Sequence, residues 1–144
     1  MFDIDLTPGV MEDSDVTYGV IRLNDFSEPF EALLGYWSED EYRRQWRRSI
    51  HRVVYLRADS YLITSISDPK TSNFLMWWPI YLEGFTAIFQ NQILFFESCN
   101  PEFDPERPYL SLSPRDSVGE SGYGVSEWKV SLNDLEDWYK QQSE

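Results

Sequence analysis

The side chains that most often carry out catalysis are scarce in this chain, which has one histidine and one cysteine, His51 and Cys99. A histidine that acts as a general base needs a nucleophile and an orienting acid beside it, whereas His51 lies within a run of arginines. Acidic residues near Cys99 disfavour the thiolate that a reactive cysteine requires. We therefore expect a surface or packing role for His51 and an unreactive Cys99.

Carboxylates are abundant, but no arrangement of them predicts a metal site or acid catalysis. Glu102, Asp104 and Glu106 alternate within one segment, yet the calcium loop of EF-hands, with its central glycine and final glutamate, is absent. Nothing among the 25 acidic residues marks out a glycosidase pair. The phosphate-binding loop, the dinucleotide fingerprint and the Gly-x-Ser-x-Gly elbow are also missing. The sequence predicts a protein that is not an enzyme and that needs no cofactor and no metal.

The clearest structural element is a helix from Ser38 to Arg57. Ser38 and Glu41 can form a capping box, and the acids at 39–41 lie in the first turn, where the helix dipole favours negative charge. An apolar stripe at the helical period then predicts the buried face. Its residues are Tyr42, Trp46, Ile50 and Val53.

The other face of this helix is basic and carries six of the 12 Lys and Arg residues in the chain. The six are Arg43, Arg44, Arg47, Arg48, Arg52 and Arg57. A nucleic-acid patch is disfavoured, because the chain has a net charge of −13 and its acidic remainder would repel a phosphate backbone. The favoured interpretation is that most of these arginines pair with nearby acids or lie in solvent. Buried arginine–carboxylate pairs are an alternative.

Length and composition indicate a single domain over residues 1–144, long enough to bury a hydrophobic core. Its nine Tyr, nine Phe and six Trp residues suit either a core or an interface. The patterns of a signal peptide and of a membrane span are absent, so we expect a cytoplasmic protein, and a monomer is the favoured state. The acidic balance argues against nucleic acid and membranes and in favour of a basic protein partner.

Hairpin-linked apolar segments mixed with helices predict an α+β fold with a largely antiparallel sheet, on which the basic helix and a C-terminal helix pack. Strands are expected over 17–23, 60–66, 74–82, 85–89, 93–96, 109–112 and 123–130, a turn over 24–29, and either a strand or a short helix over 30–36. Pro79 predicts an edge strand or a bulge.

The remaining segments are expected to be irregular, apart from the C-terminal helix. Residues 1–16 are acidic and read as an irregular lead-in, and the proline-rich segment 99–108 must be a surface loop. The helix over 131–142 begins with a capping-box-like Ser131 and Asp134. Its apolar face consists of Leu132, Leu135, Trp138 and Tyr139.

Several segments are informative when they are taken together. They are Tyr36-Trp37-Ser38 with Asp40, Tyr42, Gln45 and Trp46; Leu62 to Ile66 with Asp68-Pro69; Trp77 to Tyr81; Gln90-Asn91 before Ile93-Leu94; and Ser126-Glu127-Trp128. In combination they resemble the immunity proteins of bacterial contact-dependent growth inhibition systems. The resemblance covers about residues 30–140. It implies a small cytoplasmic protein that binds and neutralises the toxin domain of a matching effector, which in such systems is often a nuclease. The resemblance does not transfer a binding site residue by residue.

Two classes of function stay open at this point. The first is an inhibitor of a basic toxin domain, which an acidic protein can reach by long-range attraction. The alternative is a non-catalytic regulatory or scaffold domain that binds another cationic protein, and an acid-catalysed hydrolase ranks well below both. A toxin gene immediately upstream would separate the first class from the others.

The segments 99–108 and 113–122 are the predicted toxin-binding region, since binding residues often lie in surface loops. Their acids would supply the docking charge, and two aromatic residues would be apolar anchors. The predicted residues are Glu102, Phe103, Asp104, Glu106, Tyr109, Asp116 and Glu120. The N-terminal acids Glu12, Asp13 and Asp15 are the next candidates.

Overall fold

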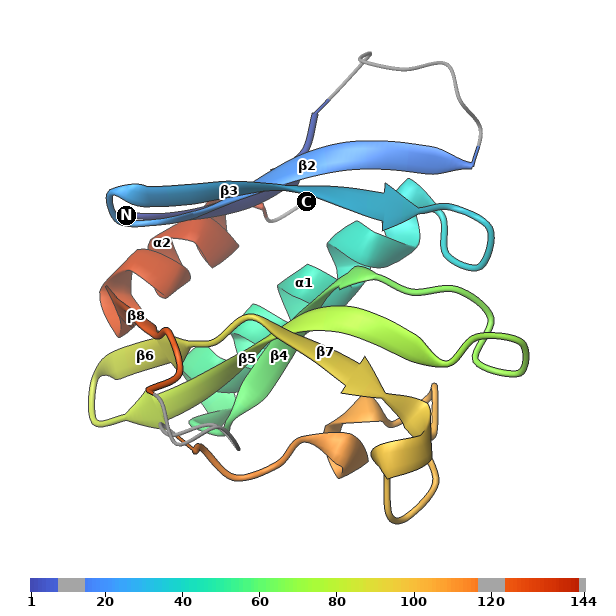
Figure 1. Ribbon diagram of the computed structural model, residues 1–144. Helices are drawn as coiled ribbons and strands as arrows, with labels where there is room; N and C mark the ends of the chain where they lie inside the picture. Colours follow the sequence, from blue (N-terminus) through green and yellow to red (C-terminus); the bar gives the residue numbers. More distant parts are fainter. Residues whose placement is uncertain (8–14, 117–123, 143–144) are drawn as a thin grey trace.

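Alternating apolar and polar residues build the first sheet from the N-terminal part of the chain. The structure, a computed structural model, describes residues 1–7, 15–116 and 124–142. Its first three strands are antiparallel in the order β1-β2-β3 (Figure 1): β1 (Phe2–Leu6), β2 (Val16–Leu23) and β3 (Phe26–Leu33). The irregular lead-in predicted for residues 1–16 is therefore wrong for Phe2–Leu6. Successive side chains of a strand point to opposite faces. Phe2, Ile4 and Leu6 therefore share the buried face, and the acids between them lie on the outer face.

β3 also resolves the two neighbouring predictions. The segment 30–36 is extended up to Leu33, so the strand reading was right and the helix reading wrong for that part. The turn predicted over 24–29 is confined to Asn24 and Asp25, and Asn24 has a positive φ of 58°. Asparagine tolerates this left-handed conformation better than most residues, which is why two residues are enough to reverse the chain.

The second sheet is formed by the middle and end of the chain and is also antiparallel. Its order is β4-β5-β6-β8, and β7 pairs with β5. The five strands are β4 (Ser60–Ser65), β5 (Phe74–Glu83), β6 (Thr86–Phe89), β7 (Gln92–Phe95) and β8 (Trp128–Ser131). Figure 1 shows this sheet below the first one, with α1 behind the two. The prediction of an α+β fold with antiparallel strands is confirmed.

Pro79 does not mark an edge strand, because β5 lies in the interior of the sheet and pairs on both sides. The N–H and C=O of one residue in an antiparallel strand point to the same neighbour. The carbonyl of Pro79 accepts from the backbone N–H of Gln90 at 3.0 Å. Gln90 lies between β6 and β7, at the break where β5 changes partner. The proline therefore occupies the point where a missing N–H does least harm to the sheet.

Helix α1 (Glu39–Leu56) has the predicted start, with a capping box between Ser38 and Glu41. The predicted apolar stripe, Tyr42, Trp46, Ile50 and Val53, is fully buried, with each side chain at most 1% exposed. Arg57 caps the C-terminal end of the helix and adopts the left-handed conformation with φ 54°.

The buried face of α1 does more than fill the core, because it covers the free edge of β4. Gln45 donates to the carbonyl of Tyr61 at 3.2 Å and accepts from the N–H of Ile63 at 2.9 Å. Trp46 Nε1 donates to the carbonyl of Ile63 at 2.7 Å. The hydroxyl of Tyr42 accepts from the N–H of Ile66 at 3.0 Å. Side chains of a helix thus satisfy backbone groups that a neighbouring strand would otherwise bind.

The two sheets contact each other through aromatic side chains, and the C-terminal helix covers one end of this contact. The ring of Trp128 in β8 lies 4.5 Å from Phe26 and 5.4 Å from Trp78. The ring of Phe2 lies 5.6 Å from Phe89 and 5.4 Å from Trp138 of α2 (Leu132–Gln141). The predicted C-terminal helix and its Ser131 cap are confirmed.

Between β7 and β8 the chain has little regular structure. The predicted strand over 109–112 is wrong, since these residues belong mainly to a 3-10 helix, η2 (Pro108–Ser111), which a proline at its first position favours. A second one, η1 (Phe96–Ser98), follows β7. In the described part of the chain, no helix combines the length and apolar character that crossing a membrane requires.

Candidate functional site

The three alternating acids, Glu102, Asp104 and Glu106, lie in the connection between η1 and η2. They differ in the number of hydrogen bonds and ion pairs that their carboxylates make. Glu102 and Glu106 are exposed. Asp104 accepts from the backbone N–H of Glu106 at 2.9 Å and pairs with Arg107 at 3.0 Å. The hydrogen bond from Glu106, followed by that from Arg107, lowers the pKa of Asp104. Asp104 therefore helps to shape this connection, while Glu102 and Glu106 present carboxylates to solvent.

The two aromatic residues predicted as anchors have different surroundings. Phe103 is buried, and its ring stacks on Phe96 at 4.6 Å. Phe103 can enter a pocket on a partner protein only if its stack with Phe96 opens. Tyr109 is 41% exposed, and the guanidinium of Arg52 lies 5.3 Å from the centre of its ring. Of the two, Tyr109 is the one already placed to contact a partner.

The second predicted loop is anchored by a partly buried glutamate. Glu127 accepts from Arg115 at 2.7 Å and 2.8 Å and from Gln90 at 2.8 Å. The Arg115 hydrogen bonds, more than that of Gln90, lower the pKa of Glu127. Gln90 also donates to the backbone carbonyl of Asp116, whose side chain is exposed. Glu120, Glu12 and Asp13 lie outside the described residues.

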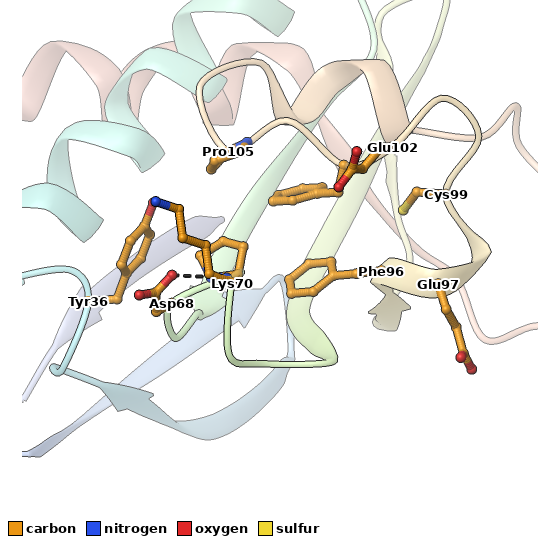
Figure 2. Close-up of a pocket in the computed structure, with 10 residues that line it drawn as sticks. Tyr36, Asp68, Lys70, Phe96, Glu97, Cys99, Glu102 and Pro105 are labelled. Atoms are coloured by element: carbon orange, nitrogen blue, oxygen red, sulfur yellow. Dashed lines mark hydrogen bonds between the residues drawn. The ribbon is translucent and has the colours of Figure 1, made fainter.

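A cavity of about 760 Å³ opens beside Glu102 (Figure 2). It combines aromatic walls with carboxylates and one lysine. Its lining consists of Tyr36, Asp68, Pro69, Lys70, Phe96, Glu97, Cys99, Glu102, Phe103 and Pro105. Aromatic rings and carboxylates together attract a cationic side chain. The cavity is therefore suited to a lysine or arginine from outside, and Lys70 of this chain also reaches into it (Figure 2).

The residues with catalytic potential are in packing positions. The imidazole of His51 lies 5.1 Å from the ring of Tyr55 and 5.6 Å from that of Tyr139. The Cys99 thiol donates to the carbonyl of Phe95 at 3.6 Å. Neither contact supplies the base or the orienting acid that nucleophilic catalysis uses.

The arginines on the basic face of α1 contact aromatic rings and backbone carbonyls as well as carboxylates. Arg43 pairs with Asp5 at 3.3 Å and with Glu39 at 3.6 Å, as the favoured interpretation expected. Arg47 instead lies 4.3 Å from the ring centre of Tyr139. Arg57 lies 5.0 Å from the ring centre of Phe85 and donates to the carbonyl of Gly84. Cation–π contacts of this kind keep arginines at the surface without pairing each with an acid.

A group of exposed apolar side chains at the end of the second sheet was not predicted from the sequence. Phe74 pairs with Phe95 and Met76 with Ile93, so the four side chains lie on the same side of β5 and β7. We call these four residues the apolar face. The alternation of the two strands was visible in the sequence, but both sides of β5 are apolar there, and the exposed side could not be distinguished from the buried one.

Comparisons with known proteins agree over nearly the whole chain. A family model described as the CdiI N-terminal domain matches residues 32–138. The immunity protein CdiI of Enterobacter cloacae subsp. cloacae is 30% identical over 132 residues, which cover 92% of this chain and 90% of that protein. A chain in the solved CdiA-CT/CdiI toxin and immunity complex from Enterobacter cloacae is also 30% identical. It superposes with a TM-score of 0.85 over 98% of this chain and 97% of that one.

Proposed function

This chain belongs to the CdiI N-terminal domain family, and on that premise we propose that it protects the cell that makes it by binding a toxin domain and blocking that domain's activity. It is an immunity protein of a contact-dependent growth inhibition system. The observation that carries the proposal is the match over 98% of this chain to a chain of a toxin and immunity complex. We propose that the protein acts in the cytoplasm.

We further propose that the toxin is a nuclease with a basic surface. A nuclease domain needs cations to hold its phosphate-rich substrate. This chain has a net charge of −13, so a basic surface attracts it electrostatically. Attraction between opposite charges acts over a long range and raises the rate of association. Inhibition would then come from occupying the toxin surface, with no chemical step on the part of the immunity protein.

The exposed acids between η1 and η2 support this docking role. Glu102 and Glu106 are available to a basic partner, whereas Asp104 already pairs with Arg107. We therefore propose that Glu102 and Glu106 contribute more of the steering charge than Asp104 does. Tyr109, exposed beside them, would add an aromatic contact of the kind found at interface hot spots.

The test is to take the toxin domain of the effector gene that we expect immediately upstream of the gene for this chain, to express it in cells with and without the chain, and to measure growth. We expect growth arrest by the toxin alone and recovery when the immunity protein is present. The purified pair should form a complex, and the toxin should cleave nucleic acid only when free. The Enterobacter cloacae CdiI relative is a control for specificity. If the chain neither binds the toxin nor restores growth, the alternative of a regulatory or scaffold domain gains support.

A further inference from the structure

The apolar face is a surface feature that the fold itself does not explain. Phe74 is 44% exposed, Met76 38%, Ile93 49% and Phe95 49%. The intervening residues of the same strand, Leu75 and Trp77, are each 1% exposed. The strands therefore bury one side in the core and present the other, equally apolar, to solvent.

The four side chains form one continuous patch. The rings of Phe74 and Phe95 are 6.2 Å apart, and Met76 and Ile93 are direct cross-strand partners. The end of β3 comes near this patch, since the N–H of Leu33 donates to Oγ of Ser65, the β4 partner of Met76. With about 200 Å² for a large apolar side chain, the four residues expose roughly 350 Å². A patch of this size on a monomer is often a binding site.

The residues that flank the apolar face along the chain, or that contact its strands, are mainly acidic. Asn91, just before β7, donates to Glu28 of β3 at 3.0 Å, which places that carboxylate beside the start of β7. Glu31 is two residues before Leu33 on β3, and Glu97 is two residues after Phe95. The turn before Phe74 adds Asp68 and one base, Lys70. An apolar centre with a charged rim is the usual anatomy of a protein interface.

From this arrangement we propose that the apolar face is the centre of the surface that binds the toxin domain, with Phe74 and Phe95 as its principal anchors. This inference rests on the proposed function, which supplies a basic partner. The acidic rim favours such a partner, and it opposes a second copy of this chain, because two acidic rims would repel each other. The acids of the connection between η1 and η2 then lie at one end of the interface, past Phe96.

The experiment compares the double variant Phe74→Ala/Phe95→Ala with the wild-type chain in binding to the purified toxin domain, by surface plasmon resonance. Loss of two anchors should raise Kd by about 30-fold or more, mainly through faster dissociation. Phe85→Ala is the matched control, because Phe85 is 76% exposed at the tip of the β5–β6 turn. The control should bind within about threefold of the wild type.

A second variant keeps the test decisive if the double variant folds poorly. Ile93→Lys adds a cation at the centre of the apolar face, where a basic partner would be repelled, and circular dichroism melting verifies the fold of each variant. Wild-type affinity in a folded Phe74→Ala/Phe95→Ala or Ile93→Lys protein would overturn the inference. A wild-type dimer that the double variant converts to a monomer, seen by sedimentation, would also overturn it. A wild-type chain that does not bind the toxin domain at all would instead refute the proposed function itself.

Discussion

The substitution Gln45→Leu should test how much the helix contributes to the edge of β4. Gln45 is 5% exposed, and its amide binds the carbonyl of Tyr61, the N–H of Ile63 and the hydroxyl of Ser49. Leucine has a similar volume but leaves these buried groups without a partner. Each unsatisfied buried group costs about 1–3 kcal/mol, and the added apolar burial offsets about 1 kcal/mol.

The net loss expected for Gln45→Leu is therefore at least about 2 kcal/mol of unfolding free energy, or at least about 4–8 °C in Tm for a domain of this size. Urea denaturation followed by circular dichroism measures it. Gln141→Leu is the control, because Gln141 is exposed on α2, and it should stay within about 0.5 kcal/mol of the wild type. A Gln45→Leu protein as stable as this control, with an unchanged m-value, would show that the edge hydrogen bonds contribute nothing net.

Three further predictions concern charge and packing. Charge reversal at Glu102 and Glu106 should slow association with the toxin domain several-fold at low salt and much less at high salt, as stopped-flow traces would show; equal rates at every ionic strength would contradict the steering role. The pKa of Glu127 is lowered in the folded state, so its contribution to stability is present above its unfolded pKa of about 4.3 and is lost as pH falls through the folded pKa. The stability gap between wild type and Glu127→Gln, measured in urea, should accordingly narrow from pH 7 to pH 3. Gly19→Ala should destabilise the chain by at least about 1–3 kcal/mol, because the new Cβ would lie 2.5 Å from the ring of Phe30; a variant with wild-type Tm would refute this.

The helices were predictable because their signals are local. The capping box at Ser38 and the stripe from Tyr42 to Val53 need only neighbours along the chain, and the same holds for Ser131 at the start of α2. The hairpin between the strands predicted over 74–82 and 85–89, which turns at Gly84, was predictable for the same reason. β1 was missed because its acidic residues were given more weight than the alternation of Phe2, Ile4 and Leu6, which the structure shows to be the informative pattern.

The site was harder to predict because its features depend on distant segments. Phe103 looked like a loop residue, yet it stacks on Phe96, which follows a strand that pairs with β5. Pro79 suggested an edge strand, because proline lacks the N–H that an interior strand donates. In the structure β5 is interior and changes its partner from β6 to β7 opposite Pro79. This arrangement depends on two strands that come later in the chain, so the sequence around Pro79 could not show it. The exposed acids Glu102 and Glu106 were predictable, since a proline-rich acidic segment must lie at the surface.

The hydrogen bonds between α1 and β4 also bear on the order in which the chain folds. Gln45 and Trp46 bind Ile63 across separations of only 18 and 17 residues, whereas the N-terminal amino group pairs with Asp134 across 133. Closing a short loop costs less entropy, so contacts near in sequence form sooner than distant ones. We therefore expect the helix and its strand to associate in the folding transition state, and the contact between the two ends of the chain to form after the barrier has been crossed. Changes at the α1–β4 edge would then slow folding, while changes at Asp134 would mainly speed unfolding.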